Sequence, residues 1–244
     1  MIRAEKISKS YGNRLVIRDL DFCLEPGEIV ALLGINGAGK TTFIRALCGL
    51  NKPDSGSIQV DGDNLSDSSP DIRRKFGVVL HSTLLYNNLT CRENLEFYAR
   101  LYDLDSMNER VNQSLEVMDL LSRANEKAGT LSRGMQQRLS IARAMIHDPL
   151  YILFDEVFTG LDRRFVNMNI ELIQREAGAG KGILFSTHDL DMVFSAATRV
   201  VILHKGDIIF SQAVEGLDPQ HFKRTYDDLV QEPDQVLGSS GRRK

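Results

Sequence analysis

The sequence predicts an α/β protein whose core is a parallel β-sheet covered by helices. Short apolar runs alternate with helical patterns along the second half of the chain, and this alternation favours a parallel sheet. A glycine-rich loop joins the apolar run 29–33 to a helical segment over 42–50, as in a strand–loop–helix unit. Residues 1 to about 62 carry mostly short strand and turn patterns, which predicts a β-rich N-terminal part.

The individual elements follow from local patterns. Polar residues 63–70 predict a surface loop before a short helix. Helical spacing of apolar residues predicts helices over 92 to about 124, and we interpret the aromatic side chains there as packing residues. A further helix is expected over 136–146. The predicted strands are 2–7, 15–24, 29–33, 57–60, 76–80, 151–154, 182–186 and 199–203.

Composition limits the classes of function. The chain has 30 basic and 33 acidic residues, a net charge of −3, which does not indicate a nucleic-acid surface. No apolar run approaches the ~20 residues that cross a bilayer, so we expect a cytosolic protein or one held at a membrane by a partner. The three cysteines and five histidines lack the spacing of disulfide or metal sites.

The glycine-rich loop has the pattern of a phosphate-binding P-loop, G-x-x-x-x-G-K-[ST]. Its glycines let backbone N–H groups point at phosphates, and the helix N-terminus adds partial positive charge. We expect Lys40 to reach the β- and γ-phosphates of ATP and the Thr41 hydroxyl to bind Mg²⁺. The predicted nucleotide-binding residues of this loop are Gly34, Ile35, Asn36, Gly37, Ala38, Gly39, Lys40, Thr41 and Thr42.

Two acidic residues follow the apolar run 151–154. Downstream of a P-loop, such a strand predicts that Asp155 holds Mg²⁺, directly or through water, and that Glu156 polarises the water that attacks the γ-phosphate. The P-loop and the pair Asp155–Glu156 both follow the carboxyl ends of predicted strands, where parallel sheets bind ligands.

The segment Ser132–Arg138, with the sequence SRGMQQR, resembles the signature motif L-S-G-G-Q of ATP-binding cassette (ABC) transporter subunits. Ser132 can cap the following helix, and the backbone of Gly134 can approach a phosphate. The resemblance covers residues 1 to about 215. It implies a RecA-like parallel core, an N-terminal antiparallel β subdomain and an inserted helical signature subdomain over about 88–145. It also implies a head-to-tail pair that encloses two ATP molecules, either a homodimer or two different nucleotide-binding subunits, so that Ser132, Arg133 and Gly134 face the γ-phosphate bound by the other subunit.

The resemblance assigns four further residues. Tyr11 stands where the family stacks an aromatic ring on adenine, and Val16 is expected to pack beside that ring. Asp162 belongs to the loop that crosses the dimer interface. His188 matches the switch histidine, whose imidazole contacts the γ-phosphate and orients the attacking water.

Three residues depart from the family pattern. His81 replaces the usual Gln or Glu that touches Mg²⁺ and the attacking water; its imidazole can bind water but supplies no carboxamide oxygen. Arg133 replaces the first signature glycine, either binding phosphate or facing solvent. Val157 replaces a proline, which should loosen the loop slightly. None of these changes removes a group that is needed for binding ATP.

The resemblance implies a subunit that hydrolyses ATP at the cytoplasmic face of a membrane, with separate permease subunits. Segments 94–102, 132–138 and 156–162 look most like haem exporters of cytochrome c maturation or multidrug-type exporters, so export is favoured. The alternative is an ABC ATPase that drives assembly, of the iron–sulfur type, without a transporter. We expect one domain over 1–236 and a disordered tail over 237–244.

Overall fold

A computed structural model describes residues 1–67, 70–158 and 163–231. The strands are β1 (Ile2–Tyr11), β2 (Arg14–Leu24), β3 (Ile29–Leu33), β4 (Ser55–Val60), β5 (Asp63–Asn64), β6 (Phe76–Val79), β7 (Tyr151–Asp155), β8 (Gly182–Ser186), β9 (Arg199–His204) and β10 (Asp207–Ala213). The α-helices are α1 (Lys40–Leu47), α2 (Pro70–Arg74), α3 (Cys91–Leu101), α4 (Met107–Val117), α5 (Arg133–Met145), α6 (Arg163–Gly178), α7 (Leu190–Ala196) and α8 (Pro219–Gln231). Short 3₁₀ turns are η1 (Leu65–Asp67), η2 (Leu121–Arg123) and η3 (Ala128–Thr130).

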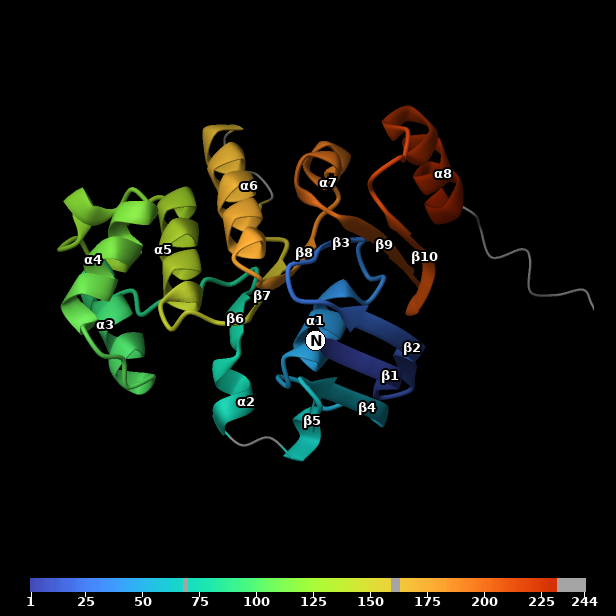
Figure 1. The fold of residues 1–244 in the computed structure, drawn as a ribbon, viewed down its shortest axis with the longest axis horizontal. Coiled ribbons are helices and arrows are strands. Elements are labelled where there is room, and N and C mark those ends of the chain that lie inside the picture. Colours follow the sequence, from blue (N-terminus) through green and yellow to red (C-terminus); the bar gives the residue numbers. More distant parts are fainter. Residues whose placement is uncertain (68–69, 159–162, 232–244) are drawn as a thin grey trace, which may run out of the picture.

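The strands form two sheets (Figure 1). The larger sheet has the order β10-β9-β3-β8-β7-β6, and its strands are parallel except for β10, which pairs antiparallel with β9. The smaller sheet, β2-β1-β4-β5, is antiparallel throughout. The predicted α/β class, with a parallel core and an N-terminal antiparallel part, is therefore confirmed.

The central strands are apolar and buried on both faces. Every residue of β3, β7 and β8 is buried, as expected for parallel strands that helices cover on each side. Successive residues of β3 belong to two different hydrophobic cores. Ala31 and Leu33 lie in the core that contains residues of α6 and α7, whereas Val30 and Leu32 lie in the core formed with α1 and the antiparallel sheet. The carboxyl end of β3 thus emerges between two packed layers.

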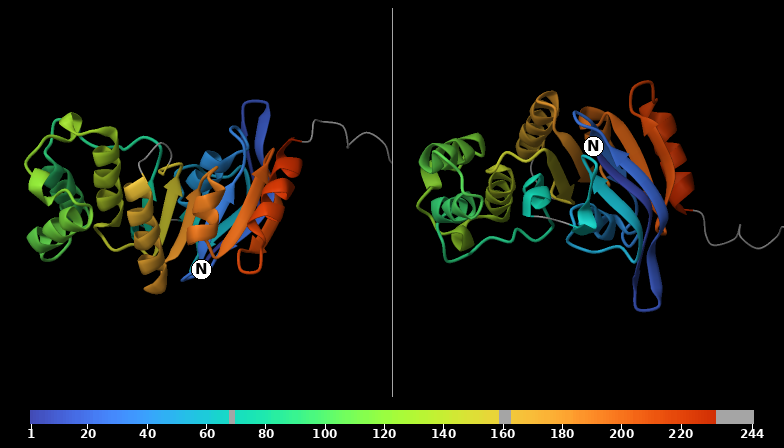
Figure 2. Two further views of the ribbon diagram at one scale, coloured as in Figure 1. Left: turned by 90° about the horizontal axis from the view of Figure 1, so that it is seen from above. Right: turned by 60° about the horizontal axis from the view of Figure 1, so that its bottom comes forward.

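Helices α6, α7 and α8 lie along one face of the larger sheet, and α1 and the antiparallel sheet lie on the other (Figure 1). Helices α3, α4 and α5 form a separate group beyond β6, the edge strand (Figure 2). Within this group α5 packs on β6 and on both other helices. In the part of the chain that the structure describes, no helix combines the length and apolarity needed to cross a bilayer.

Side-chain caps fix the starts of three helices. Thr90 and Glu93 form a reciprocal capping box at α3. Ser132 accepts a hydrogen bond from the Met135 backbone N–H at α5, as predicted. Asp189 caps α7 in the same manner. Two of these caps, at Ser132 and Asp189, stand beside residues with predicted roles in ATP hydrolysis.

Several predicted boundaries were wrong. Helix α1 ends at Leu47 rather than residue 50, and α5 begins at Arg133 rather than 136. Residues 63–67 form β5 and η1 instead of a loop, because Leu65 is buried in the core beside α1. Strand β10 and helix α8 were not predicted; Phe222 on α8 packs against Phe194 and Phe210. The predicted tail over 237–244 lies outside the described residues.

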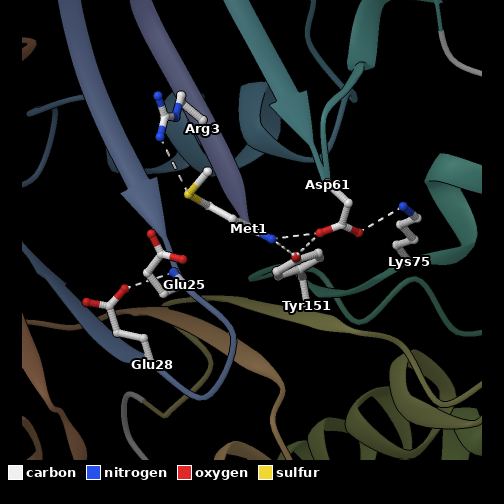
Figure 3. A network of polar contacts seen from close by, with 7 residues as sticks. All are labelled: Met1, Arg3, Glu25, Glu28, Asp61, Lys75 and Tyr151. Atoms are coloured by element: carbon white, nitrogen blue, oxygen red, sulfur yellow. Dashed lines mark hydrogen bonds and ion pairs between the residues drawn. The ribbon is translucent and has the colours of Figure 1, made fainter.

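A polar cluster joins the antiparallel sheet to the larger one (Figure 3). Asp61, in the turn after β4, accepts hydrogen bonds from the Tyr151 hydroxyl at 2.6 Å and from Lys75 at 2.8 Å. The amino group of Met1 contacts both Asp61 and Tyr151. Burial alone would raise the pKa of Asp61, but the bonds from Lys75, the Met1 amino group and Tyr151 hold it well below its usual value.

We predict that Asp61→Asn lowers the free energy of unfolding by about 1 kcal/mol at pH 7, because it removes the charge that these donors share. Since the pKa of Asp61 is lowered on folding, its contribution should be complete above about pH 5 and should decline as the pH falls below ~4. Denaturant unfolding of both forms from pH 7 to pH 3 measures this. Asp63→Asn, at a nearby exposed carboxylate, is the control; an equal effect of both variants would contradict the prediction.

Candidate functional site

The P-loop lies where β3 ends and α1 begins, between the two layers. Gly34 leaves β3 so close to β9 that an added Cβ would lie 2.4 Å from the Leu203 backbone oxygen. Gly39 precedes α1 with φ +111°, and its added Cβ would lie 3.0 Å from the Val16 backbone oxygen. Both glycines are therefore required by close backbone packing as well as by the loop's curvature.

Lys40 is held inside this loop. Its side chain is only 5% exposed, and its ammonium group donates to the backbone oxygens of Gly34 at 2.7 Å and Ile35 at 3.3 Å. The same nitrogen lies 3.2 Å from Glu156 Oε1. A buried cation needs such partners, and this arrangement keeps the charge of Lys40 at the mouth of the loop.

Asp155 and Glu156 are organised by a serine on the next strand. Strand β7 places Asp155 opposite Ser186 of β8, and the Ser186 hydroxyl donates to Asp155 Oδ1 at 3.1 Å. The same hydroxyl accepts the Glu156 backbone N–H at 2.9 Å. Glu156 has a φ of +53°, which directs its side chain toward Lys40. Sequence reasoning missed Ser186, although its place at the end of a buried strand was a usable signal.

His188 lies two residues beyond β8, between two fixed neighbours. The Thr187 backbone N–H donates to the Leu32 backbone oxygen on β3 at 3.2 Å, and Asp189 caps α7. The His188 side chain is exposed. It therefore stands at the same edge of the sheet as the P-loop, with its imidazole open to a ligand there.

A cavity of about 300 Å³ lies over the P-loop. It is lined by Arg14, Val16, Ile35, Asn36, Gly37, Gly39, Lys40, Thr41, Thr42 and Glu156. Most of the predicted P-loop residues, Val16 and Glu156 are thus brought together. Arg14 is an addition that sequence reasoning passed over; its guanidinium comes within 3.9 Å of where a Cβ on Gly37 would stand.

Four further predicted residues, Asp155, His188, Tyr11 and His81, do not line this cavity. Tyr11 ends β1, is 50% exposed and pairs with Arg14 on β2; its hydroxyl accepts a hydrogen bond from Asn51 at 2.7 Å. His81 follows β6, which β7 and β8 separate from β3, and its side chain is exposed. The roles of Tyr11 in stacking adenine and of His81 toward Mg²⁺ and water stay predictions.

The signature residues also lie elsewhere. Ser132, Arg133 and Gly134 begin α5, within the helical group beyond β6, and none of them lines the P-loop cavity. Arg133 is exposed. Asp162 lies outside the described residues, so its predicted place at an interface stays a prediction.

The residues near the P-loop fit Mg²⁺ bound together with phosphates. Thr41 offers a hydroxyl at the start of α1, and Asp155 offers a carboxylate that is 2% exposed. Mg²⁺ usually keeps waters and substrate phosphates beside one or two protein oxygens rather than filling an all-protein cage. In keeping with this, the described residues contain no group of three or more His, Cys, Asp or Glu side chains placed to hold a metal.

The fold and the loop define a P-loop nucleotide-binding protein, and comparisons with known proteins narrow the class. A family model described as "ABC transporter" matches residues 17–159. The ABC transporter ATP-binding protein NatA of Bacillus subtilis is 38% identical over 204 residues, which cover 82% of this chain and 83% of NatA. The SkfA peptide export ATP-binding protein SkfE of the same organism is 36% identical over 211 residues, covering 86% and 87%.

Solved structures agree with this. The structure described as the ATP binding subunit of an ABC transporter has a TM-score of 0.83 and 30% identity, covering 95% of each chain. A dimeric ATP-binding cassette in a post-hydrolysis state, bound to ADP and Pi, has a TM-score of 0.82 and 27% identity, covering 89% of this chain and all of that one. The chain therefore belongs to the ABC transporter family as an ATP-binding subunit, and it is an ATPase of that type.

We predict that Arg14→Gln weakens ATP binding roughly tenfold, because a charge-assisted bond to a phosphate contributes about 1.5 kcal/mol. Titration calorimetry with ATP and with ADP measures the effect. Arg3→Gln removes an exposed arginine from the neighbouring strand β1 and serves as control. Unchanged affinity in Arg14→Gln would show that the Arg14 side chain faces solvent and does not contact ATP.

Proposed function

We propose that this chain powers export by hydrolysing ATP between two copies, at the cytoplasmic face of a membrane, on behalf of separate permease subunits. Lys40 and Glu156 meet at the P-loop cavity, whereas the signature residues Ser132–Gly134 stand at the start of α5 in another part of the molecule. This separation is the main support for the proposal. One copy therefore supplies phosphate binding and water activation, and a second copy supplies the signature backbone.

In the proposed hydrolysis of ATP, each residue of the site has a separate role. Lys40 binds the terminal phosphates, and Arg14 adds a second cation at the cavity mouth. Glu156 accepts the proton of the attacking water, while Ser186 holds its backbone in place. His188 orients the same water from the end of β8. Thr41 and Asp155 would hold Mg²⁺, which would supply positive charge beside the phosphate oxygens.

The second copy completes the site. The helix N-terminus at Ser132 presents free backbone N–H groups and partial positive charge, and Gly134 lets that backbone approach a phosphate. Arg133 is exposed beside it and can add a cation. A head-to-tail pair would bring each α5 to the other P-loop and enclose two ATP molecules. The solved cassette described above is dimeric and bound to ADP and Pi, which supports pairing of such chains.

A groove suits the membrane partner. It has a volume of about 490 Å³ and lies between the end of α1, strand β6 and the helical group. Leu50 and Leu84 line it and are 58% and 54% exposed. The loop after β6 is fixed there, since Ser140 on α5 donates to the Thr83 backbone oxygen at 3.0 Å and Asn94 donates to the backbone oxygen of Tyr86 at 3.1 Å.

The deeper wall of the groove combines aromatic rings with one buried cation, since Arg143 lies with its guanidinium 5.2 Å from the ring centroid of Tyr98. The imidazole of His147 stacks on Tyr102 with ring centroids 3.8 Å apart and donates through Nε2 to the Phe76 backbone oxygen at 3.0 Å. Burial lowers the pKa of His147 to about 4, so this ring is neutral at pH 7. An apolar helix or turn from a permease would find exposed leucines at the rim and aromatic rings below.

Several relatives are named for peptide export or Nod factor export, whereas another is named for spermidine/putrescine import. The direction of transport therefore rests on the export names together with the motif resemblance. Haem export for cytochrome c maturation rests only on the motif resemblance of segments 94–102, 132–138 and 156–162; the names of the reported relatives do not mention haem. The substrate is chosen by the membrane subunit, so haem stays a specific hypothesis for that partner. The alternative, an assembly ATPase of the iron–sulfur type, is distinguished by what binds the chain.

We predict that Glu156→Gln binds ATP but hydrolyses it at least about 100-fold more slowly, because the acceptor of the water proton is lost. The tagged variant, extracted from native membranes in mild detergent with ATP and Mg²⁺, should retain a protein with several membrane-spanning segments. Mass spectrometry identifies it and points to the substrate. Recovery of soluble partners alone would replace the transporter proposal with the assembly ATPase.

We also predict that Leu84→Asp abolishes recovery of the membrane protein while ATP binding is unchanged, because a charge at the groove rim opposes an apolar contact. Leu121→Asp is the matched control: Leu121 is 42% exposed on the same helical group but lies outside the groove. Quantitative recovery of the partner by Leu84→Asp would show that the permease docks elsewhere.

A further inference from the structure

The turn between β9 and β10 touches both sides of the nucleotide site. The Gly206 backbone N–H donates to the Ala38 backbone oxygen in the P-loop at 3.1 Å, and the Gly206 backbone oxygen accepts the Arg18 N–H on β2 at 3.0 Å. One residue thus joins the phosphate-binding loop to the strand that begins with Arg14. Both bonds use backbone atoms, so they depend on the path of the chain rather than on side-chain identity.

There is no space for a side chain at this position. A Cβ on Gly206 would lie 2.5 Å from the Val16 backbone oxygen and 3.0 Å from the Val16 carbonyl carbon, and φ is +89°. The same Val16 oxygen would lie 3.0 Å from a Cβ added to Gly39, at the end of the P-loop that enters α1. Gly39, Val16 and Gly206 therefore form a continuous backbone contact from the start of α1 to the β9–β10 turn.

We propose that Gly206 is a positioning residue for nucleotide binding: it fixes β2, with Arg14 and Val16, at a set distance from the P-loop. Arg14 and Val16 line one side of the cavity, and Lys40 and Thr41 line the other. The two sides come from different sheets, since β2 belongs to the antiparallel sheet and the P-loop follows β3. Gly206 bonds to both. The proposal rests on this cavity being the ATP site.

The geometry gives the expected effect of adding a methyl group. Contacts of a Cβ under 3.0 Å essentially do not occur, so either Val16 or the turn must move by about half an ångström in Gly206→Ala. That displacement widens the cavity and changes the angle of Arg14 and Val16 toward the P-loop. Loss of one charge-assisted hydrogen bond to a phosphate corresponds to roughly tenfold in affinity, so we expect ATP affinity to fall roughly tenfold here.

Gly180 offers a matched control. It has a φ of +91°, nearly that of Gly206, yet an added Cβ meets nothing within 4 Å. It lies in the turn between α6 and β8, away from the cavity lining. Gly180→Ala therefore carries the same backbone strain without the steric displacement.

The experiment compares the two variants by melting temperature, by the dissociation constant for a fluorescent ATP analogue, and by KM and kcat for ATP. We expect a larger loss of melting temperature in Gly206→Ala, because it adds the contact with Val16 to the backbone strain that both variants share. A roughly tenfold rise in dissociation constant and KM is expected only in Gly206→Ala. Equal, unchanged affinities in both variants would overturn the proposal and leave Gly206 as a turn residue.

A second pair of variants guards against failure to fold. Inserting one glycine after Gly206 adds no side chain but breaks the simultaneous bonds to Ala38 and Arg18; the same insertion after Gly180 is the control. We expect only the first insertion to weaken ATP binding. Lys40→Ala tests the site itself: if it binds ATP normally, the cavity is not the ATP site, a result distinct from failure of the Gly206 proposal.

Discussion

The site depends on close packing between backbones. The P-loop leaves β3 against the Leu203 backbone and enters α1 against the Val16 backbone, so Gly34 and Gly39 cannot carry side chains. These contacts hold the loop between the parallel sheet and the antiparallel sheet. Because close-packed interiors transmit small displacements, the position of Lys40 depends on strands that are far from it in sequence. The Asp61 cluster joins the same two sheets at the other end of β7.

If the site is shared between two copies, as we propose, this packing explains why each copy holds its two halves apart. The sheet edge brings together a cation, two carboxylates and a serine at Lys40, Asp155, Glu156 and Ser186. The helix N-terminus at Ser132 is held by its own cap in a different group of helices. The groove that we propose for a membrane partner lies between the end of α1, strand β6 and the helical group, so movement of the helical group relative to the sheet would change the shape of this groove.

The sequence was sufficient to predict those elements whose pattern lies within one short segment of the chain. The buried strands at β3 and β8 and the P-loop match their predicted ranges because apolar runs bounded by glycine and polar residues are unambiguous. Helix α8 and strand β10 were missed because their apolar residues meet only in three dimensions, as Phe210 and Phe222 do. Arg14 carries no motif of its own, and the position of Ser186 beside the switch histidine did not indicate a role toward Asp155; the pairing of β7 with β8 places Ser186 there.

The most direct test of the account mixes two inactive variants. Lys40→Ala removes phosphate binding and Gly134→Asp blocks the signature backbone, so each should be inactive alone. In random pairs, half the dimers combine the two and contain one intact site, so the ATPase activity of the mixture should return to about a quarter of the wild-type value. Full activity of Gly134→Asp on its own would contradict the shared site, because it would show that one copy hydrolyses ATP without the signature segment of another.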